Sequence, residues 1–280
     1  MINQDVSIFI ALVHNNNIRR NIAIRPRLEN LLQGLEPHFT VEKIEVSFQP
    51  EIKPHSTVMA FIRDVMYRNL DREWHRYRLL KPLNLLRDIL GFIKGSFIKY
   101  IVERDSTGKS WKRSSAIEVL VTEKHLRAWG GFLDSGADFL LCFEDDAVFK
   151  DDSVQRIKGL IGLLSRGSLD APIYVDLAGG CGLNELKIDN LETGYEDSFR
   201  FFRKPVTNTA CVYLMSRTLV AHFHATLARR PWLRLIGADW LMNSLFIRLA
   251  NDGIECVCMH AEPTVFKHGT AMGDYVSTIR

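Results

Sequence analysis

Short apolar stretches alternate with longer amphipathic ones along the first fifty residues. Residues 6–13 (VSIFIALV) form a nearly continuous apolar run rich in β-branched side chains, which predicts a buried strand. Residues 18–35 place leucines at helical spacing, with Pro26 expected near the start of the helix. Residues 41–46 (VEKIEV) alternate as in a second strand. This β-α-β order predicts an α/β fold with a parallel sheet.

The same alternation resumes at residue 116. It predicts one α/β domain over residues 1–280, with an irregular tail over residues 263–280. The expected strands cover residues 138–143, 173–177, 209–215 and 254–257, and the expected helices cover residues 123–135, 153–164 and 239–250.

Residues 55–115 interrupt this alternation with a mostly helical, basic insert. Between residues 60 and 115 there are 13 Lys and Arg against 6 Asp and Glu, a net +7, so the remainder carries about −4 of the overall +3. This local charge favours contact with an anionic surface or ligand, although a solvated helical face would also explain it. Two interpretations stay open: a packed helical hairpin, or a helix pair on an anionic membrane. Residues 105–115 are expected to form a loop.

Composition narrows the class of protein. With 280 residues, 46% hydrophobic and 25% charged, the chain is typical of a globular protein and too weakly basic to indicate nucleic-acid binding. The longest apolar runs have six residues, whereas a membrane-spanning helix needs about 20, and the start lacks the basic region of a secretory signal. Five cysteines without a CxxC pair predict neither a disulfide framework nor a Cys-rich zinc site. We therefore expect a cytoplasmic protein.

The most informative local feature is an acidic triplet directly after a buried strand: Glu144, Asp145 and Asp146. Ligand sites of open α/β sheets lie at such strand ends. Adjacent carboxylates repel one another, and a divalent cation relieves that repulsion. Oxygen ligands favour Mg²⁺ or Mn²⁺, which can hold a diphosphate. The alternative is an acidic turn that caps the following helix.

Several blocks, in order, resemble the family-25 glycosyltransferases, which have the nucleotide-sugar-binding GT-A fold and build lipopolysaccharide and related glycans. Residues 136–149 (GADFLLCFEDDAVF) are similar to the acidic strand of that family, and residues 208–219 (NTACVYLMSRTL) to its Tyr-bearing strand that enters a helix through Ser-Arg. Residues 10–20 (IALVHNNNIRR), 115–129 (SAIEVLVTEKHLRAW) and 236–241 (IGADWL) resemble its opening strand, the segment ahead of the acidic strand and a late Asp block. Residues 55–115 have no counterpart in the family pattern.

The resemblance implies a GT-A-like (Rossmann-like) α/β fold, with a mixed, mostly parallel central sheet flanked by helices and a helical insert. It also implies a metal-dependent, inverting transfer of a sugar from a nucleotide donor, with a UDP-sugar as the default. It implies Mn²⁺ or Mg²⁺ as cofactor, bound directly by Asp146, supported by Glu144 and completed by His268, with His260 as the second candidate. Glu144 would also face the nucleotide ribose, and Asp145 would contact the donor sugar or phosphate.

Two further groups of residues are candidates for the reaction. Asp239, at a predicted helix start, is the candidate base for the acceptor hydroxyl, although an Asp there also serves as an N-cap. Trp240 would stack on the acceptor sugar or belong to the core. Further donor-binding candidates, which follow the first strand or precede the strand near residue 210, are His14, Asn15, Arg20 or Arg19, Asn208 and Thr209.

The sequence therefore predicts a glycosyltransferase of bacterial-type surface polysaccharide or lipopolysaccharide biosynthesis, with a glycan or glycolipid acceptor and peripheral contact with the inner face of the membrane. The basic insert is the candidate for acceptor recognition or membrane docking. Two alternatives stay open. One is a nucleotide-sugar- or carbohydrate-binding protein of the same fold without catalysis. The other is a metal-dependent phosphoryl or nucleotidyl transferase, which fits the acidic strand end but lacks a phosphate loop.

Overall fold

The structure is a computed structural model of the whole chain, in which the placement of most residues is defined. The residues it describes are 6–47, 53, 55–65, 85–98, 111–166, 170–186, 192–203, 206–207 and 209–275.

The chain divides into two compact units, each assembled from separate segments. The first unit comprises residues 1–48, 124–224 and 255–276, and the second comprises residues 49–123, 225–254 and 277–280. The described residues of the predicted basic insert, 55–65, 85–98 and 111–115, belong to the second unit, and the remainder of the predicted helical hairpin lies outside the described residues.

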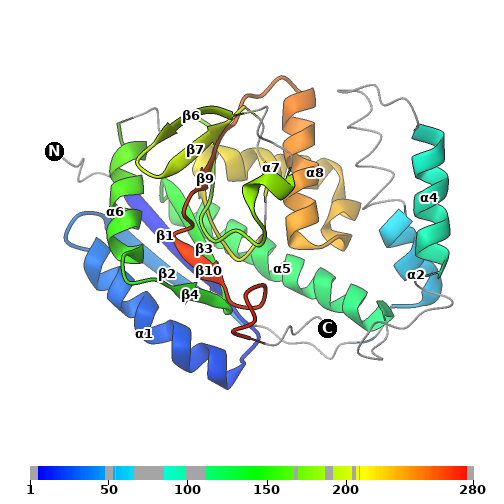
Figure 1. The fold of residues 1–280 in the computed structure, drawn as a ribbon, viewed down its shortest axis with the longest axis horizontal. Coiled ribbons are helices and arrows are strands. Elements are labelled where there is room, and N and C mark those ends of the chain that lie inside the picture. Colours follow the sequence, from blue (N-terminus) through cyan, green and yellow to red (C-terminus); the bar gives the residue numbers. More distant parts are fainter. Residues whose placement is uncertain are drawn as a thin grey trace. The chain divides into compact units, whose positions relative to one another are not determined.

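The first unit is built on an eight-stranded sheet and a separate two-stranded sheet (Figure 1). Six of the eight strands point in one direction, and β8 and β7 are reversed, so the large sheet is mixed. The strands in order across the large sheet are β2 (Thr40–Val46), β1 (Ser7–Val13), β3 (Phe139–Glu144), β8 (Val212–Ser216), β5 (Ile173–Asp176), β9 (Val257–Ala261), β7 (Phe199–Phe202) and β6 (Glu192–Glu196), and the small sheet pairs β4 (Ala147–Phe149) with β10 (Phe266–His268).

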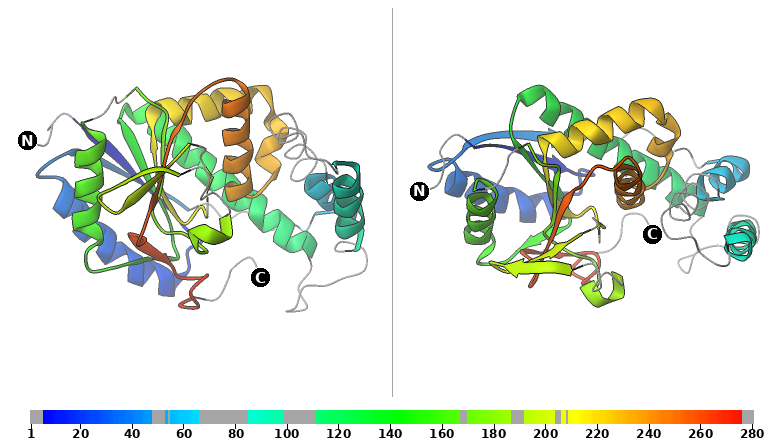
Figure 2. Two further views of the ribbon diagram at one scale, coloured as in Figure 1. Left: turned by 45° about the horizontal axis from the view of Figure 1, so that its top comes forward. Right: turned by 90° about the horizontal axis from the view of Figure 1, so that it is seen from above.

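Helices cover both faces of the large sheet (Figures 1 and 2). On one face lie α1 (Ile18–Leu35) and α6 (Ser153–Leu164), whose buried residues join one apolar cluster with the strands. On the other face lie α5 (Trp111–Ser135), from residue 124 onward, and the first part of α7 (Arg217–Arg229). An α/β fold with a mixed central sheet flanked by helices is thereby confirmed.

Strand β1 shows how the sequence directs this layering. Its side chains alternate between the two faces, as the two-residue period of a strand requires. Ile8 and Ile10 are fully buried in the cluster with α1 and α6. Phe9 points to the opposite face, where its ring lies 6.0 Å from that of Phe132 in α5. A strand covered on both faces reads as a continuous apolar run, which is why residues 6–13 predicted it.

Three local predictions were wrong in detail. Pro26 lies inside α1, not near its start, and its exposed position lets water satisfy the carbonyl that its missing N–H leaves unpaired. The expected loop at residues 105–115 overlaps the start of α5 at Trp111. The tail is not wholly irregular, because β10 pairs in antiparallel fashion with β4, His268 opposite Ala147.

The described part of the second unit is helical. Arg63 is 1% exposed; it donates a hydrogen bond to the Leu235 carbonyl at 3.2 Å and forms an ion pair with Glu118. Thr122 donates to the carbonyl of Ile236 at 2.6 Å. The elements of this unit, besides the start of α5 and the end of α7, are α2 (Thr57–Ile62), α4 (Leu85–Phe97), the 3₁₀ helix η5 (Pro231–Leu235) and α8 (Ala238–Asn251). Across the described ranges, no helix combines the length and apolarity that are needed to cross a bilayer.

Candidate metal centre

Strand pairing brings three distant segments of the first unit together at one end of the sheets. Glu144, the last residue of β3, pairs with Val13 of β1, and its N–H donates to the carbonyl of Cys211 at 2.7 Å. Because β8 runs antiparallel to β3, the residue that precedes β8 lies where β3 ends. In the small sheet, His268 pairs with Ala147, the residue after Asp146.

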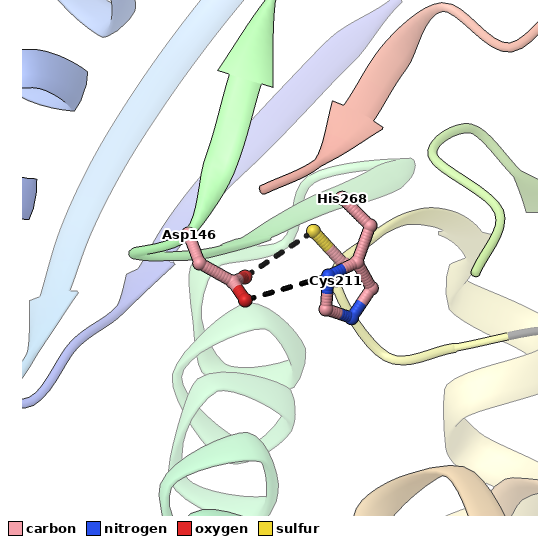
Figure 3. Close-up of side chains that lie close together, drawn as sticks. All are labelled: Asp146, Cys211 and His268. Atoms are coloured by element: carbon pink, nitrogen blue, oxygen red, sulfur yellow. Dashed lines mark hydrogen bonds and ion pairs between the residues drawn. The ribbon is translucent and has the colours of Figure 1, made fainter. Parts of the chain in front are cut away.

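As a result, Asp146, Cys211 and His268 form a compact group that could hold a metal ion (Figure 3). The Cys211 thiol donates to Oδ1 of Asp146 at 3.4 Å, and Nδ1 of His268 lies 3.5 Å from Oδ2 of Asp146. One candidate ligand atom from each residue lies within 4.8 Å of the other two. Asp146 is 4% exposed and Cys211 fully buried. A carboxylate, an imidazole and a thiol are a donor set that suits divalent transition metals.

The hydrogen bonding of His268 favours a cation beside Asp146. The N–H of Ala271 donates to Nδ1 of His268 at 3.1 Å, so Nδ1 acts as a hydrogen-bond acceptor. Two acceptors, Nδ1 and a carboxylate oxygen, therefore face each other at 3.5 Å without a proton between them. A cation there would attract both atoms, and Nδ1 would exchange the bond from Ala271 for the metal.

Arg20 connects the two neighbouring aspartates but neutralises only one of them. Its Nη1 donates to Oδ1 of Asp145 at 2.7 Å, and the N–H of Asn15 donates to Oδ2 of Asp145 at 2.9 Å. The other guanidinium nitrogen donates to Oγ1 of Thr270, whose hydroxyl in turn donates to Asp146. Within the described residues, no Lys or Arg contacts the Asp146 carboxylate directly. Asp146 is thus the member of the triplet whose charge a bound cation would balance.

Glu144 is engaged elsewhere and does not join the metal group. Its Oε1 lies 2.9 Å from Nε2 of His125, and Nδ1 of His125 lies 2.9 Å from the hydroxyl of Tyr213, which also accepts the indole N–H of Trp129. Burial alone would lower the pKa of His125, but Cys142 and the bonded Glu144 carboxylate outweigh it and raise the pKa to about 10. The Glu144 side chain is 23% exposed, so one edge still reaches the surface near the centre.

Lys124 fixes the loop after β1, where two predicted donor-binding residues lie. This side chain is fully buried, and its Nζ donates to the His14 carbonyl at 2.8 Å and to Oδ1 of Asn15 at 2.6 Å. Burial lowers the pKa of Lys124, which Asp145 and Glu144 oppose. His14 is also buried, which lowers the pKa of its ring. The loop is therefore held rigidly by buried groups, with Asn15 half-buried at its edge.

Gly269 allows the C-terminal segment to approach the centre closely. Its N–H donates to the Asp146 carbonyl at 2.9 Å, and its own carbonyl accepts the N–H of Tyr275 at 3.1 Å. A Cβ at this position would lie 2.7 Å from the Asp146 carbonyl oxygen and 2.5 Å from the Tyr275 ring. Only glycine fits without displacement of those neighbours.

The predicted catalytic base belongs to the second unit. Asp239 is half-buried in the first turn of α8, and its Oδ1 accepts the N–H of Trp240 at 2.8 Å. The N-cap residue of this helix is Gly237, so Asp239 is not the N-cap that its position suggested. A Cβ at Gly237 would lie 3.3 Å from Oδ1 of Asp239 and 3.8 Å from Oε2 of Glu118, so two carboxylates flank this glycine. The roles of Asp239 as base and Trp240 as acceptor contact stay predictions.

The remaining candidates are spread over the first unit. Thr209 is half-buried, and its Oγ1 accepts the Cys211 N–H at 3.4 Å. Arg19 is exposed on α1. His260 is buried in β9 opposite Asp176 and is not part of the Asp146 group. Asn208 lies outside the described residues.

Sequence reasoning missed Cys211 and Thr270. Cys211 lies within the block at residues 208–219 but has no CxxC partner, so no cysteine spacing marks it as a ligand. Cys211 reaches the site because the start of β8 lies beside the acidic end of β3. Finding it from the sequence would require knowledge that these two strands pair in antiparallel fashion.

The sequence matches no known protein-family profile and no curated protein. The residues of this centre are therefore the basis for assigning a function.

Proposed function

We propose that the protein is a metal-dependent glycosyltransferase that transfers a sugar from a nucleotide-sugar donor to a glycan or lipid-linked acceptor, with a GT-A-like arrangement of its sheet. The observation that carries this proposal is the approach of His268 to within 3.5 Å of Asp146 at the end of β3, beside the buried Arg20. An acidic strand end with a late histidine and an adjacent guanidinium suits a nucleoside diphosphate and its metal.

Different residues would perform the separate steps of the proposed reaction. Asp146 and His268 would hold the divalent metal, which when bound supplies positive charge for a leaving diphosphate. Arg20 orders both aspartates through Asp145 and Thr270, so the centre is shaped before the donor arrives. Asp239 is the proposed base that takes the proton of the acceptor hydroxyl in an inverting, in-line displacement.

Thermal shift with UDP-, GDP- and CMP-sugars, each without metal and with Mn²⁺ or Co²⁺, tests donor and metal together. A ligand at 100 times its Kd stabilises a protein by about 2.7 kcal/mol, which corresponds to a rise in Tm of about 5 °C for a protein of this size. We expect such a rise for one nucleotide only, and only with metal. Asp146→Asn should abolish it, whereas Asp151→Asn, at an exposed position before α6, should leave it intact. Metal-independent stabilisation or none would contradict the proposal.

Turnover of the donor identified in this way then separates a transferase from a binding protein. Loss of a general base costs about 10²–10⁴ in rate, so Asp239→Asn should lower kcat by that factor while donor binding persists. Asp252→Asn, at the other end of α8 and exposed, is the matched control. Unchanged turnover in Asp239→Asn would refute its role, and donor binding without any turnover would favour the non-catalytic alternative.

We further propose that the second unit contacts an anionic membrane through α4. This helix exposes Leu90, Ile93, Lys94 and Phe97, which follow the spacing of one helical face. A triple Leu90→Gln, Ile93→Gln, Phe97→Gln variant should stop sedimenting with liposomes that contain anionic lipid. Glutamine at two exposed isoleucines of α1, Ile18 and Ile22, should change nothing. Equal sedimentation of both variants would refute membrane contact through this face.

A further inference from the structure

We infer that Cys211 is the third protein ligand of this centre, and that the centre consequently prefers a borderline metal such as Zn²⁺, Co²⁺ or Fe²⁺ to Mg²⁺. The inference rests on the metal centre of the proposed function, but not on sugar transfer.

The distances match a metal-binding geometry. With metal–ligand bonds of about 2.0–2.3 Å, two ligands of a tetrahedral ion lie about 3.3–3.6 Å apart. The Cys211 sulfur lies 3.4 Å from one carboxylate oxygen of Asp146, and the His268 nitrogen lies 3.5 Å from the other. The thiol and imidazole need to approach each other from within 4.8 Å. The two distances end on different oxygens of Asp146, so ligation needs the sulfur and the nitrogen to close by up to about 1.5 Å, which rotation of the two side chains can supply.

The backbone on either side of Cys211 is fixed. Its N–H donates to Oγ1 of Thr209, and its carbonyl accepts the N–H of Glu144. The sulfur is fully buried and points at Asp146 (Figure 3). The buried thiol already donates to the Asp146 carboxylate, so an apolar residue of similar size would leave that buried oxygen without this donor.

The donor set decides the metal. Mg²⁺ requires near-octahedral oxygen ligation, whereas a thiolate and an imidazole select softer ions. Binding forms a sulfur–metal bond as the S–H bond breaks, and the proton passes to the buffer. This preference departs from the Mg²⁺ or Mn²⁺ expected from the acidic triplet, because only one of its three carboxylates lies in the group.

Cobalt spectroscopy tests the inference directly. All proteins carry Cys181→Ser, since Cys181 is exposed and could bind cobalt adventitiously. After metal removal, the parent is titrated with Co²⁺, and the near-ultraviolet charge-transfer band of a cobalt–thiolate bond is recorded. We expect the band to saturate at one equivalent of Co²⁺ per protein. Stoichiometric Zn²⁺ should abolish it, whereas a large excess of Mg²⁺ should not. Cys211→Ser should lose the band and bind Zn²⁺ more weakly by more than the roughly 10–100-fold typical of outer-shell changes.

Cys258→Ala is the matched control, because Cys258 is equally buried in β9 but is not part of the metal group. It should keep the band. Absence of the band in the parent, its persistence in Cys211→Ser or its displacement by Mg²⁺ would each overturn the inference. The parent measurement requires no variant at Cys211, so misfolding of Cys211→Ser cannot mask a negative result. A cobalt–thiolate band in a protein that no nucleotide sugar stabilises would retain the inference and refute the proposed function.

Discussion

Replacement of Arg20 by methionine should destabilise the first unit strongly, because it leaves Asp145 buried without its cationic partner. The side chains of Arg20 and Asp145 are 5% and 3% exposed, and their charged atoms are 2.7 Å apart. Methionine keeps most of the apolar stem of arginine, so the change removes chiefly the charge and its hydrogen bonds.

The magnitude follows from the cost of an uncompensated buried charge. Removal of one partner of a buried ion pair costs about 3–5 kcal/mol, whereas a pair replaced as a whole is often nearly neutral. For a chain of this size, that loss corresponds to a fall in Tm of about 5–9 °C. In the double variant Arg20→Met, Asp145→Asn, the amide oxygen can still accept the Asn15 N–H, and neither member of the pair is charged. We expect the double variant to regain at least about 2 kcal/mol of the loss.

Calorimetry at neutral pH measures the stability of the wild type, both single variants and the double variant, which together form a double-mutant cycle. Arg19→Met, at the exposed neighbouring position of α1, should stay within about 0.5 kcal/mol of the wild type. If Arg20→Met loses less than about 1 kcal/mol, or if Asp145→Asn recovers nothing, the pair does not carry the stability that its burial indicates.

Two further predictions concern Gly269 and His125. Gly269→Ala should cost about 1–3 kcal/mol and weaken metal binding, because its Cβ would meet the Asp146 carbonyl oxygen at 2.7 Å. Gly162→Ala, a helical site with open space around it, should be neutral or stabilising in the same calorimetric assay, and equal effects would refute the steric argument. The pKa of His125 is raised to about 10, so the stability from its charged contact with Glu144 is complete below about pH 6.5 and is lost as the pH rises through 10. His125→Gln should therefore lose less Tm than the wild type between pH 7 and 10, and parallel pH profiles would contradict a charged His125.

The elements that carry a strong period were predictable from the sequence. The apolar runs at residues 6–13 and 138–143 correspond to β1 and β3, because a strand buried on both faces needs apolar residues at nearly every position. The leucine spacing at residues 18–35 corresponds to α1, because a helix buried on one face needs them at helical spacing. The β6–β7 hairpin was not predicted, since every residue of β6 is exposed and no alternation marks it. Pattern reasoning also placed the last strand of the large sheet too early, at residues 254–257, whereas β9 covers Val257–Ala261.

The site was predictable only where adjacency in sequence implied adjacency in space. The acidic triplet follows from one strand end, but the partners of its members do not. Asp145 is bound by Arg20, Glu144 by His125, and Asp146 alone lies with Cys211 and His268. Three neighbouring carboxylates thus meet three different environments, because successive residues that leave a strand point in different directions. That division depends on strand pairing, which the sequence pattern does not specify.

The spread of the metal group along the chain also fixes when the centre can form during synthesis. Asp146 leaves the ribosome more than 100 residues before His268, which enters only with β10. Until β10 pairs with β4, the nascent chain has the large sheet's acidic strand but lacks the imidazole and the Thr270 hydroxyl that contact Asp146. Metal capture consequently follows the pairing of β10 with β4, and a nascent chain stalled before residue 266 should bind metal far more weakly than one that extends past residue 270.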